Sequence, residues 1–192
     1  MARNKAFDPE ERLEKARDLF WEKGYHATSM QDLVEAMQLN RASIYDTYGD
    51  KHGLYLQCLA NYATDKQEDY KRSAAKVQSP IQAVESIIRR ALERTMEDGK
   101  ACMVVKSSFE LAETDKEVRE LLKKDGARLT KVLEELLVKA KEAGEIRQDR
   151  DPSLLANYIL ATFSGLWQTS ILSNNKKLVH QMTDLLIEVV KQ

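Results

Sequence analysis

Apolar residues recur along most of the chain at spacings of three and four, which is the period of amphipathic helices. Capping residues, in several places followed by Pro, precede these stripes, and Gly or Asn often follows them. The pattern predicts about nine helices, no confident strand, no internal repeat and no low-complexity tract. The expected helices are 9–23, a short one from Thr28–Ser29, a short one capped by Asn40, 51 to the low seventies, Pro80 to near Gly99, Cys102–Ala112, Thr114–Asp115 to Gly144, one from Asp151–Pro152 and one after Asn174–Asn175.

The first 54 residues carry the signals of a small helical module. Asp8 is expected to cap the first helix, with Pro9 at its first position, and Gly24 ends it. Two short helices follow, joined by a tight turn at Gln38, and such a pair is a helix-turn-helix. Asp50 then caps a much longer helix that leaves the module.

Composition narrows the class of protein. With 43% hydrophobic residues and only 7 Gly and 3 Pro in 192, the chain is too apolar for disorder and too poor in turn residues for an all-β fold. Two cysteines and three scattered histidines do not form a disulfide framework or a zinc site. The charged N-terminus has no apolar signal core, and polar residues interrupt the most apolar stretch, 154–172. We expect a reduced, cytoplasmic protein with no metal, no cofactor and no membrane contact.

Enzyme signatures are missing from the sequence. It contains no Walker loop, no GxGxxG and no GxSxG pattern, and no His has Glu three residues before it, as a di-metal carboxylate site in a helical bundle would need. We therefore expect a protein that is not an enzyme.

The start of the third short helix has the chemistry of DNA readout. Short polar and cationic side chains there can reach base edges in the major groove, while apolar residues behind them hold the helix on its module. Asn40, Arg41 and Ser43 meet the first requirement, and Leu39 and Ile44 meet the second. Arg41 is suited to a bidentate contact with guanine, worth about 1–3 kcal/mol of discrimination.

Other polar residues of the module suit contacts with the phosphate backbone. Thr28 and Ser29 stand at a helix start, and Tyr45, Thr47 and Lys51 add two hydroxyls and an ammonium. Two alternatives stay open: Thr28 as a plain helix cap, and Tyr45 as a core residue with an exposed hydroxyl.

The charge of the module argues against DNA binding. Residues 1–54 contain eight Lys and Arg but ten Asp and Glu, a net charge of −2, whereas DNA-binding modules are usually basic. We expect the acids to lie away from the groove face, with Arg3 and Lys5 on a flexible arm, and a shallow salt dependence of binding. A helical interaction protein that binds no DNA is the alternative.

Taken together, the module resembles the TetR/AcrR family of transcriptional regulators, in register over about 50 residues. The resemblance rests on the run from Gly24 to Met30, the run from Asp32 to Ala36, Ser43-Ile44-Tyr45, Tyr48, Lys51 and Leu54. Departures are Gln38 at the family's usual turn glycine, Ala42 at a small residue usually glycine, and Thr47 and Tyr48 in place of the usual His and Phe. We include Ala42 in the predicted DNA-contact set.

The resemblance implies an all-α fold with an N-terminal three-helix helix-turn-helix domain, 8–66, and a larger helical effector-binding and dimerisation domain, 67–192. Two wide apolar helix faces near the C-terminus agree with a two-fold interface between chains. The expected dimer residues are Leu154, Tyr158, Ala161, Gly165, Leu172, Leu178, Met182, Leu185 and Val189. The alternative is a wide core face in a monomer.

The resemblance also implies a repressor that a small apolar ligand releases from a two-fold operator. Candidate pocket residues, each of which could equally be ordinary core, are Ile88, Leu92, Met96, Cys102, Met103, Val105, Phe109, Phe163 and Trp167. A redox- or electrophile-sensing thiol at Cys102 is an alternative trigger. Lys106 and Glu110, four apart on one helix, are expected to pair with each other in solvent.

Overall fold

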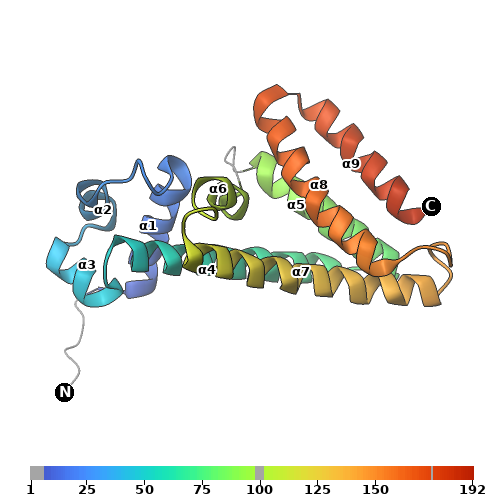
Figure 1. Ribbon diagram of the computed structural model, residues 1–192, viewed down its shortest axis with the longest axis horizontal. Helices are drawn as coiled ribbons and strands as arrows, with labels where there is room; N and C mark the ends of the chain where they lie inside the picture. The colour runs from blue at the N-terminus through green and yellow to red at the C-terminus, as the bar shows by residue number, and fades with distance from the viewer. Residues whose placement is uncertain (1–6, 98–101, 174) are drawn as a thin grey trace, which may run out of the picture. The chain divides into compact units, whose positions relative to one another are not determined.

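The computed structural model describes residues 7–97, 102–173 and 175–192, and within these ranges it contains nine α-helices and no strand. The expectation of an all-α fold with about nine helices is confirmed (Figure 1). The helices are α1 Pro9–Lys23, α2 Met30–Met37, α3 Arg41–Tyr48, α4 Lys51–Ala74, α5 Pro80–Glu97, α6 Met103–Glu110, α7 Lys116–Glu142, α8 Pro152–Ser173 and α9 Lys176–Lys191.

Local hydrogen bonds explain where the N-terminal helices begin. The carboxylate of Asp8 accepts the Glu10 N–H at 2.9 Å and caps α1. Asn40 accepts the Ser43 N–H at 2.8 Å at the start of α3, and Asp50 accepts the Gly53 N–H at 2.7 Å at the start of α4. The predicted caps at these three positions are therefore confirmed, because each depends only on residues two or three positions away.

The chain forms two compact units, and the boundary differs from the one that the sequence suggests. The first unit is Met1–Thr64 with Met103–Leu121, and the second is Asp65–Cys102 with Leu122–Gln192. The first part therefore ends close to the expected position, 66, but α6 and the start of α7 also belong to it. The reason is a set of contacts from α6 to the N-terminal helices, among them a hydrogen bond of 2.7 Å between the buried hydroxyls of Tyr55 and Ser107.

An aromatic and aliphatic core holds the first unit together. Phe20 meets the ring of Tyr55 edge-on, with centroids 5.0 Å apart. Leu33, Met37 and Ile44 are fully buried, so one face of α2 and one face of α3 are fixed against this core. Their other faces remain available to solvent.

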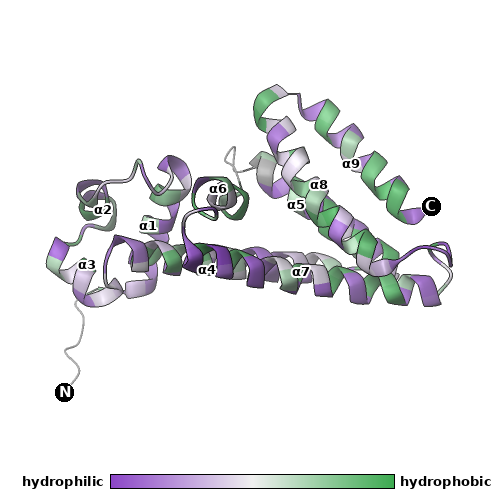
Figure 2. Ribbon diagram, viewed as in Figure 1, coloured by the Kyte–Doolittle hydropathy of each residue, from purple (hydrophilic) through white to green (hydrophobic). Residues whose placement is uncertain are grey.

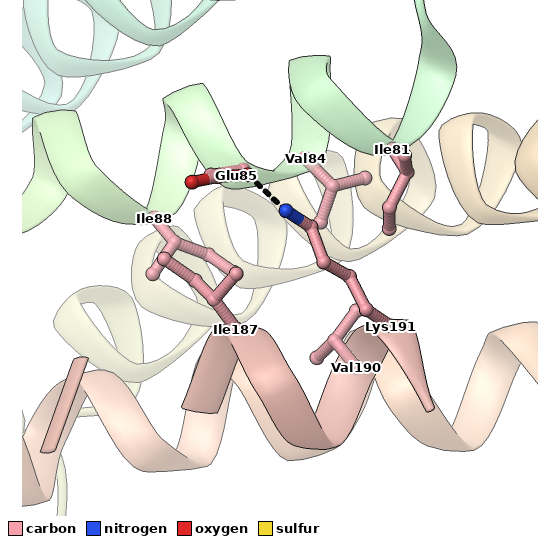
Figure 3. A pocket seen from close by; sticks show the side chains of 7 residues that line it. All are labelled: Ile81, Val84, Glu85, Ile88, Ile187, Val190 and Lys191. Atoms are coloured by element: carbon pink, nitrogen blue, oxygen red, sulfur yellow. Dashed lines mark hydrogen bonds and ion pairs between the residues drawn. The ribbon is translucent and has the colours of Figure 1, made fainter. Parts of the chain in front are cut away.

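The second unit has a larger aliphatic core. It contains residues of α5, α7, α8 and α9 together with Tyr70 near the end of α4. Between α5 and α9, Ile88 lies against Ile187, and the ammonium of Lys191 bonds to the Glu85 carboxylate at the edge (Figure 3). This space is filled by side chains, so it has no room for a ligand. Figure 2 shows that α8 and α9 are hydrophobic over much of their length.

Within the described residues, no helix is both long enough and apolar enough to cross a membrane.

Candidate nucleic-acid interface

The turn between α2 and α3 fixes the angle of the helix-turn-helix. Gln38 ends α2 with φ 53° and ψ 42°, in the left-handed region that favours glycine. Its side chain compensates, because Oε1 accepts a hydrogen bond from Arg12 of α1 at 3.2 Å. The glutamine at this position therefore adopts the backbone of a turn glycine and also ties the turn to α1.

The start of α3 presents its predicted readout residues to solvent. Asn40, Arg41 and Ala42 are exposed, and Ser43 is partly buried. Since Asn40 uses its side-chain oxygen as the helix cap, its amide NH₂ remains a donor for a base or phosphate acceptor. This end of the helix has the size and polarity that a major-groove contact requires.

The opposite face of α3 anchors it. Ile44 is fully buried, as expected, and Leu39 before the helix is partly buried. Tyr48 is 6% exposed, and its hydroxyl donates to the Pro9 carbonyl at 2.7 Å. Burial raises the pKa of Tyr48 to about 12, so this hydroxyl stays a donor. One face of α3 is therefore packed against its module, and the other face is exposed to solvent.

The predicted phosphate contacts separate into exposed and buried groups. Tyr45 is 45% exposed, which agrees with a surface role and not with a core tyrosine. Thr47 and Lys51 are partly buried. Ser29 is exposed, and its hydroxyl exchanges hydrogen bonds with Asp32 in a capping box that starts α2.

Thr28 does not fit the predicted set. The residue is 1% exposed, and its hydroxyl donates to the Gly24 carbonyl at 2.6 Å. It is not the cap of α2 either, since that role falls to Ser29. The Thr28 side chain is therefore too buried to reach a phosphate, and it fixes the connection between α1 and α2 instead.

Lys51 is held at a defined position at the start of α4. Its Nζ lies 4.4 Å from the centre of the Tyr25 ring, a cation–π contact. Desolvation lowers the pKa of Lys51, although the charges of Glu110 and Asp32 oppose the shift. The Tyr25 ring therefore holds an ammonium that burial has partly removed from water.

Several acids of the module are neutralised by neighbouring cations. Lys23 bonds to Asp32 at 2.8 Å, and Lys15 bonds to Glu11 at 3.1 Å. The hydrogen bond from Lys23 and those from Ser29 hold the pKa of Asp32 well below its usual range. These pairs fix the acids locally, but they use cations of the same module, so its net charge of −2 is unchanged.

Two further residues of this unit have partners that the sequence did not reveal. Lys106 donates to the carbonyls of Trp21 at 3.1 Å and Glu22 at 2.9 Å, and Glu110 accepts the His26 N–H at 2.9 Å. The expected pair between Lys106 and Glu110 is therefore wrong. Their spacing permits that pair, but each side chain bonds instead to backbone atoms of α1 or of the segment after it.

The candidate pocket residues are divided between the two units. In the second unit, Ile88 and Leu92 are buried in the core, Met96 and Phe163 pack against it, and Trp167 and Cys102 are partly buried. Met103, Val105 and Phe109 belong to the first unit, where Met103 is buried and Phe109 is 74% exposed. An open groove of about 1250 Å³ lies elsewhere, between α7 and residues Asn157 and Leu160 of α8, and none of the nine candidates lines it.

Most of the residues expected at a dimer interface face outward on α8 and α9. Leu154 is 68% exposed, Leu172 76% and Leu185 60%. Tyr158, Ala161, Gly165 and Leu178 are also exposed, whereas Met182 and Val189 are partly buried. The core side of the same helices is occupied by other residues, such as Leu155 and Leu186, so the outward stripes are not needed to fill the core of this unit.

Comparison with known proteins agrees with this geometry. Residues 13–58 match the family model described as bacterial regulatory proteins of the tetR family, and residues 80–186 match the tetracyclin repressor-like C-terminal domain. The HTH-type transcriptional regulator YezE of Bacillus subtilis (strain 168) is 33% identical over 162 residues, which cover 83% of this chain and 84% of YezE. The transcriptional repressor DhaR of Mycobacterium sp. (strain GP1) is 24% identical over 93% of this chain and 89% of its own.

A solved structure shows the same fold. The regulator CifR, as a cysteine mutant complexed with 26-bp operator DNA, superposes with a TM-score of 0.85 at 23% identity, over 97% of this chain and 98% of CifR. The relatives are named as regulators of transcription and not as enzymes. With a helix-turn-helix, a matching C-terminal domain and relatives of nearly equal length, the chain belongs to the TetR family of bacterial transcriptional regulators.

Proposed function

We propose that this protein represses transcription by binding a two-fold operator with the first turn of α3. The observation that carries the proposal is the exposed polar surface at Asn40 and Arg41, with the partly buried Ser43 beside it, on a helix whose other face is buried. A regulator of this kind would act in the cytoplasm, where bacterial DNA lies.

Base edges and phosphates are assigned to different residues. Arg41 is the candidate for a bidentate contact with guanine, and Asn40 and Ser43 supply shorter donors and acceptors beside it. Tyr45, Thr47, Lys51 and Ser29 surround this point with groups that suit phosphate oxygens. Ala42, exposed between Arg41 and Ser43, lets the helix backbone approach the groove closely.

A two-fold site requires two copies of α3 about 34 Å apart, one turn of DNA. The exposed apolar stripes of α8 and α9, which include Leu172 and Leu185, supply a surface for that pairing. Release by a small apolar ligand bound in the second unit is the effector part of the proposal; the family architecture supports it, whereas Ile88, Leu92 and Phe163 are packed in or against the core.

Selection from a randomised duplex library tests DNA binding and identifies the operator in one experiment. We expect one pseudo-palindromic sequence to be enriched, with nanomolar affinity by fluorescence anisotropy. Arg41→Ala should bind it about 5- to 150-fold more weakly, since one bidentate pair is worth about 1–3 kcal/mol. Arg147→Ala, which removes an exposed arginine outside the first unit, is the matched control. Failure to enrich any sequence would contradict the proposal.

A further inference from the structure

Helix α6 carries two charged side chains that bond to backbone atoms of the DNA-binding module. Lys106 and Glu110 lie one helical turn apart on α6, and their partners lie 84 and 85 residues earlier in the sequence. Since backbone partners are fixed in position, these bonds define where α6 lies on α1 and on the segment that follows it.

Lys106 completes the end of α1. The last carbonyls of a helix have no partner within the helix and carry its partial negative charge. The ammonium of Lys106 donates to two of them, those of Trp21 and Glu22, at 3.1 and 2.9 Å. A cation at this position stabilises the last turn of α1 both as a hydrogen-bond donor and as a charge.

Glu110 fixes the connection between α1 and α2. Its Oε1 accepts the His26 N–H at 2.9 Å, and its carboxylate lies directly against Gly24. A Cβ added at Gly24 would come within 2.9 Å of Glu110 Oε2. Oε2 is buried with no hydrogen-bond partner in the described residues, so the carboxylate is held by the His26 amide and by nearby charge such as Lys51.

The connection is thus held from two sides. Thr28 bonds back to Gly24 from within the module, and Glu110 holds His26 from α6. Ser29 follows at once as the N-cap of α2, and α3 begins only four residues after α2 ends. A displacement at His26 would therefore pass through α2 to the recognition residues with little chain in between to absorb it.

We propose that Glu110 and Lys106 are positioning residues for DNA recognition: they hold the 24–28 connection so that α2 and α3 keep the orientation that fits an operator. The inference rests on the proposed function, because the two residues orient the same helices that are proposed to bind DNA. Neither residue contacts DNA in this scheme, and each acts through backbone atoms of α1 and of its connection to α2.

The test compares four variants of the full-length protein on the selected operator. Glu110→Ala removes the acceptor of the His26 N–H, and Lys106→Met removes the donors but keeps the aliphatic stem. Glu110→Gln keeps a carbonyl acceptor and removes the charge. Glu113→Ala, whose side chain is exposed three residues further on, is the matched control for loss of an acid.

We expect Glu110→Ala and Lys106→Met to bind the operator about tenfold more weakly, as the loss of a charge-assisted hydrogen bond in a positioning contact implies. Glu110→Gln should stay within about threefold of wild type, and Glu113→Ala should equal it. Amide hydrogen exchange provides a readout that general destabilisation would not produce: the His26 amide should exchange faster in Glu110→Ala, while the amides of buried Leu33 and Ile44 keep their protection.

Operator binding by Glu110→Ala and Lys106→Met that is equal to or tighter than wild type would overturn the inference. Equal losses in Glu110→Gln and Glu110→Ala would also overturn it, because the acceptor would then not matter. Should Glu110→Ala fail to fold, Lys106→Met and Glu110→Gln decide the question. If wild type itself selects no operator, the proposed function fails, and His26 exchange still reports on the contact.

Discussion

The ammonium of Lys66 lies 2.6 Å from Oδ2 of Asp125, and the two side chains are only 6% and 5% exposed. Gln67 completes the arrangement by donating to the other carboxylate oxygen, Oδ1, at 2.6 Å. The pair joins α4 to α7 within the second unit. Charges removed from water in this way are tolerated only as long as each has its partner.

The free energy of unfolding should respond sharply to breaking this pair. Lys66→Met leaves the Asp125 carboxylate buried without a cation, and we expect a loss of about 3–5 kcal/mol. The double variant Lys66→Met/Asp125→Leu removes both charges and should recover most of that loss. Chemical denaturation of all three proteins measures the difference.

An exposed pair on α7 provides the control. Lys131 lies 3.9 Å from Glu135, with the two side chains 78% and 61% exposed. Lys131→Met should change the unfolding free energy by less than about 0.5 kcal/mol. If Lys66→Met lost as little unfolding free energy as Lys131→Met, solvent would have to reach the Lys66–Asp125 pair, which would contradict its burial.

Substitutions at the turn residue Gln38 can distinguish the cost of backbone strain from the contribution of the side-chain hydrogen bond. Gln38→Gly and Gln38→Ala both lose the bond from Arg12, but only glycine adopts φ 53° without strain. The glycine variant should therefore be more stable than the alanine variant by about 1 kcal/mol, as measured by thermal or denaturant unfolding. Equal stabilities would show that the turn relaxes to another backbone.

Features that depend on near neighbours in the chain could be predicted from the sequence. The caps at Asp8, Asn40 and Asp50 act over two or three residues, and the helical stripes repeat within one element. For the same reason the sequence could predict polar residues at the exposed start of α3 and the apolar stripes of α8 and α9. The family resemblance added their arrangement into two parts.

Features that depend on distant partners could not be predicted. Lys66 finds Asp125 59 residues away, and Glu110 finds His26 84 residues away, so no local pattern marks either contact. The spacing of Lys106 and Glu110 even indicated the wrong pair. Thr28 was ambiguous for a related reason: its sequence position fits a cap, and only the fold shows that Ser29 takes that role.

Gly24 and Glu110 should couple in a double-mutant cycle. Gly24→Ala combines a strained φ of 89° with a Cβ that approaches Glu110 Oε2, and we expect a loss of more than about 2 kcal/mol in unfolding free energy. In a Glu110→Ala background the clash is gone and only the strain remains. The cost of Gly24→Ala should therefore fall by about 1 kcal/mol in that background.

Gly49 is the matched glycine for this cycle. Its φ is 85°, but an added Cβ would meet no atom within 4 Å among the described residues. Gly49→Ala should therefore show the cost of strain alone, and that cost should not depend on residue 110. A cycle for Gly24 and Glu110 that gives no coupling would mean that the carboxylate moves aside freely.

The carboxyl group of Asp115 makes a part of the stability depend on pH. Desolvation raises the pKa of Asp115, but hydrogen bonds from the Val118 N–H, His52 and the Glu117 N–H outweigh it and the pKa is lowered. A depressed carboxyl pKa stabilises the fold above its ordinary value of about 3.9, and the contribution disappears as the pH falls through the folded value. Asp115→Asn should therefore be less stable than wild type at pH 7, and this gap should shrink below about pH 4.

Unfolding by urea at pH 7, 5 and 3.5 measures that gap. Asp149→Asn serves as the comparison, since the pKa of Asp149 is lowered chiefly by an exposed side-chain bond from Arg147 that solvent screens. A gap for Asp115→Asn that stayed constant with pH would contradict a native carboxylate held by these donors.

Leu185 provides the sharpest test of pairing through α8 and α9. The side chain is 60% exposed and contributes little to the core of its own unit. Leu185→Glu should therefore change the free energy of unfolding of a monomer very little. In a dimer the same carboxylate would be buried without a partner, which is strongly unfavourable.

Sedimentation measures the difference. We expect wild type to sediment at about twice the 22.0 kDa chain mass. Leu185→Glu should sediment as a folded monomer and bind the operator more weakly. Gln148→Glu, which adds the same charge on an exposed loop, should remain dimeric, and a dimeric Leu185→Glu would place the interface elsewhere.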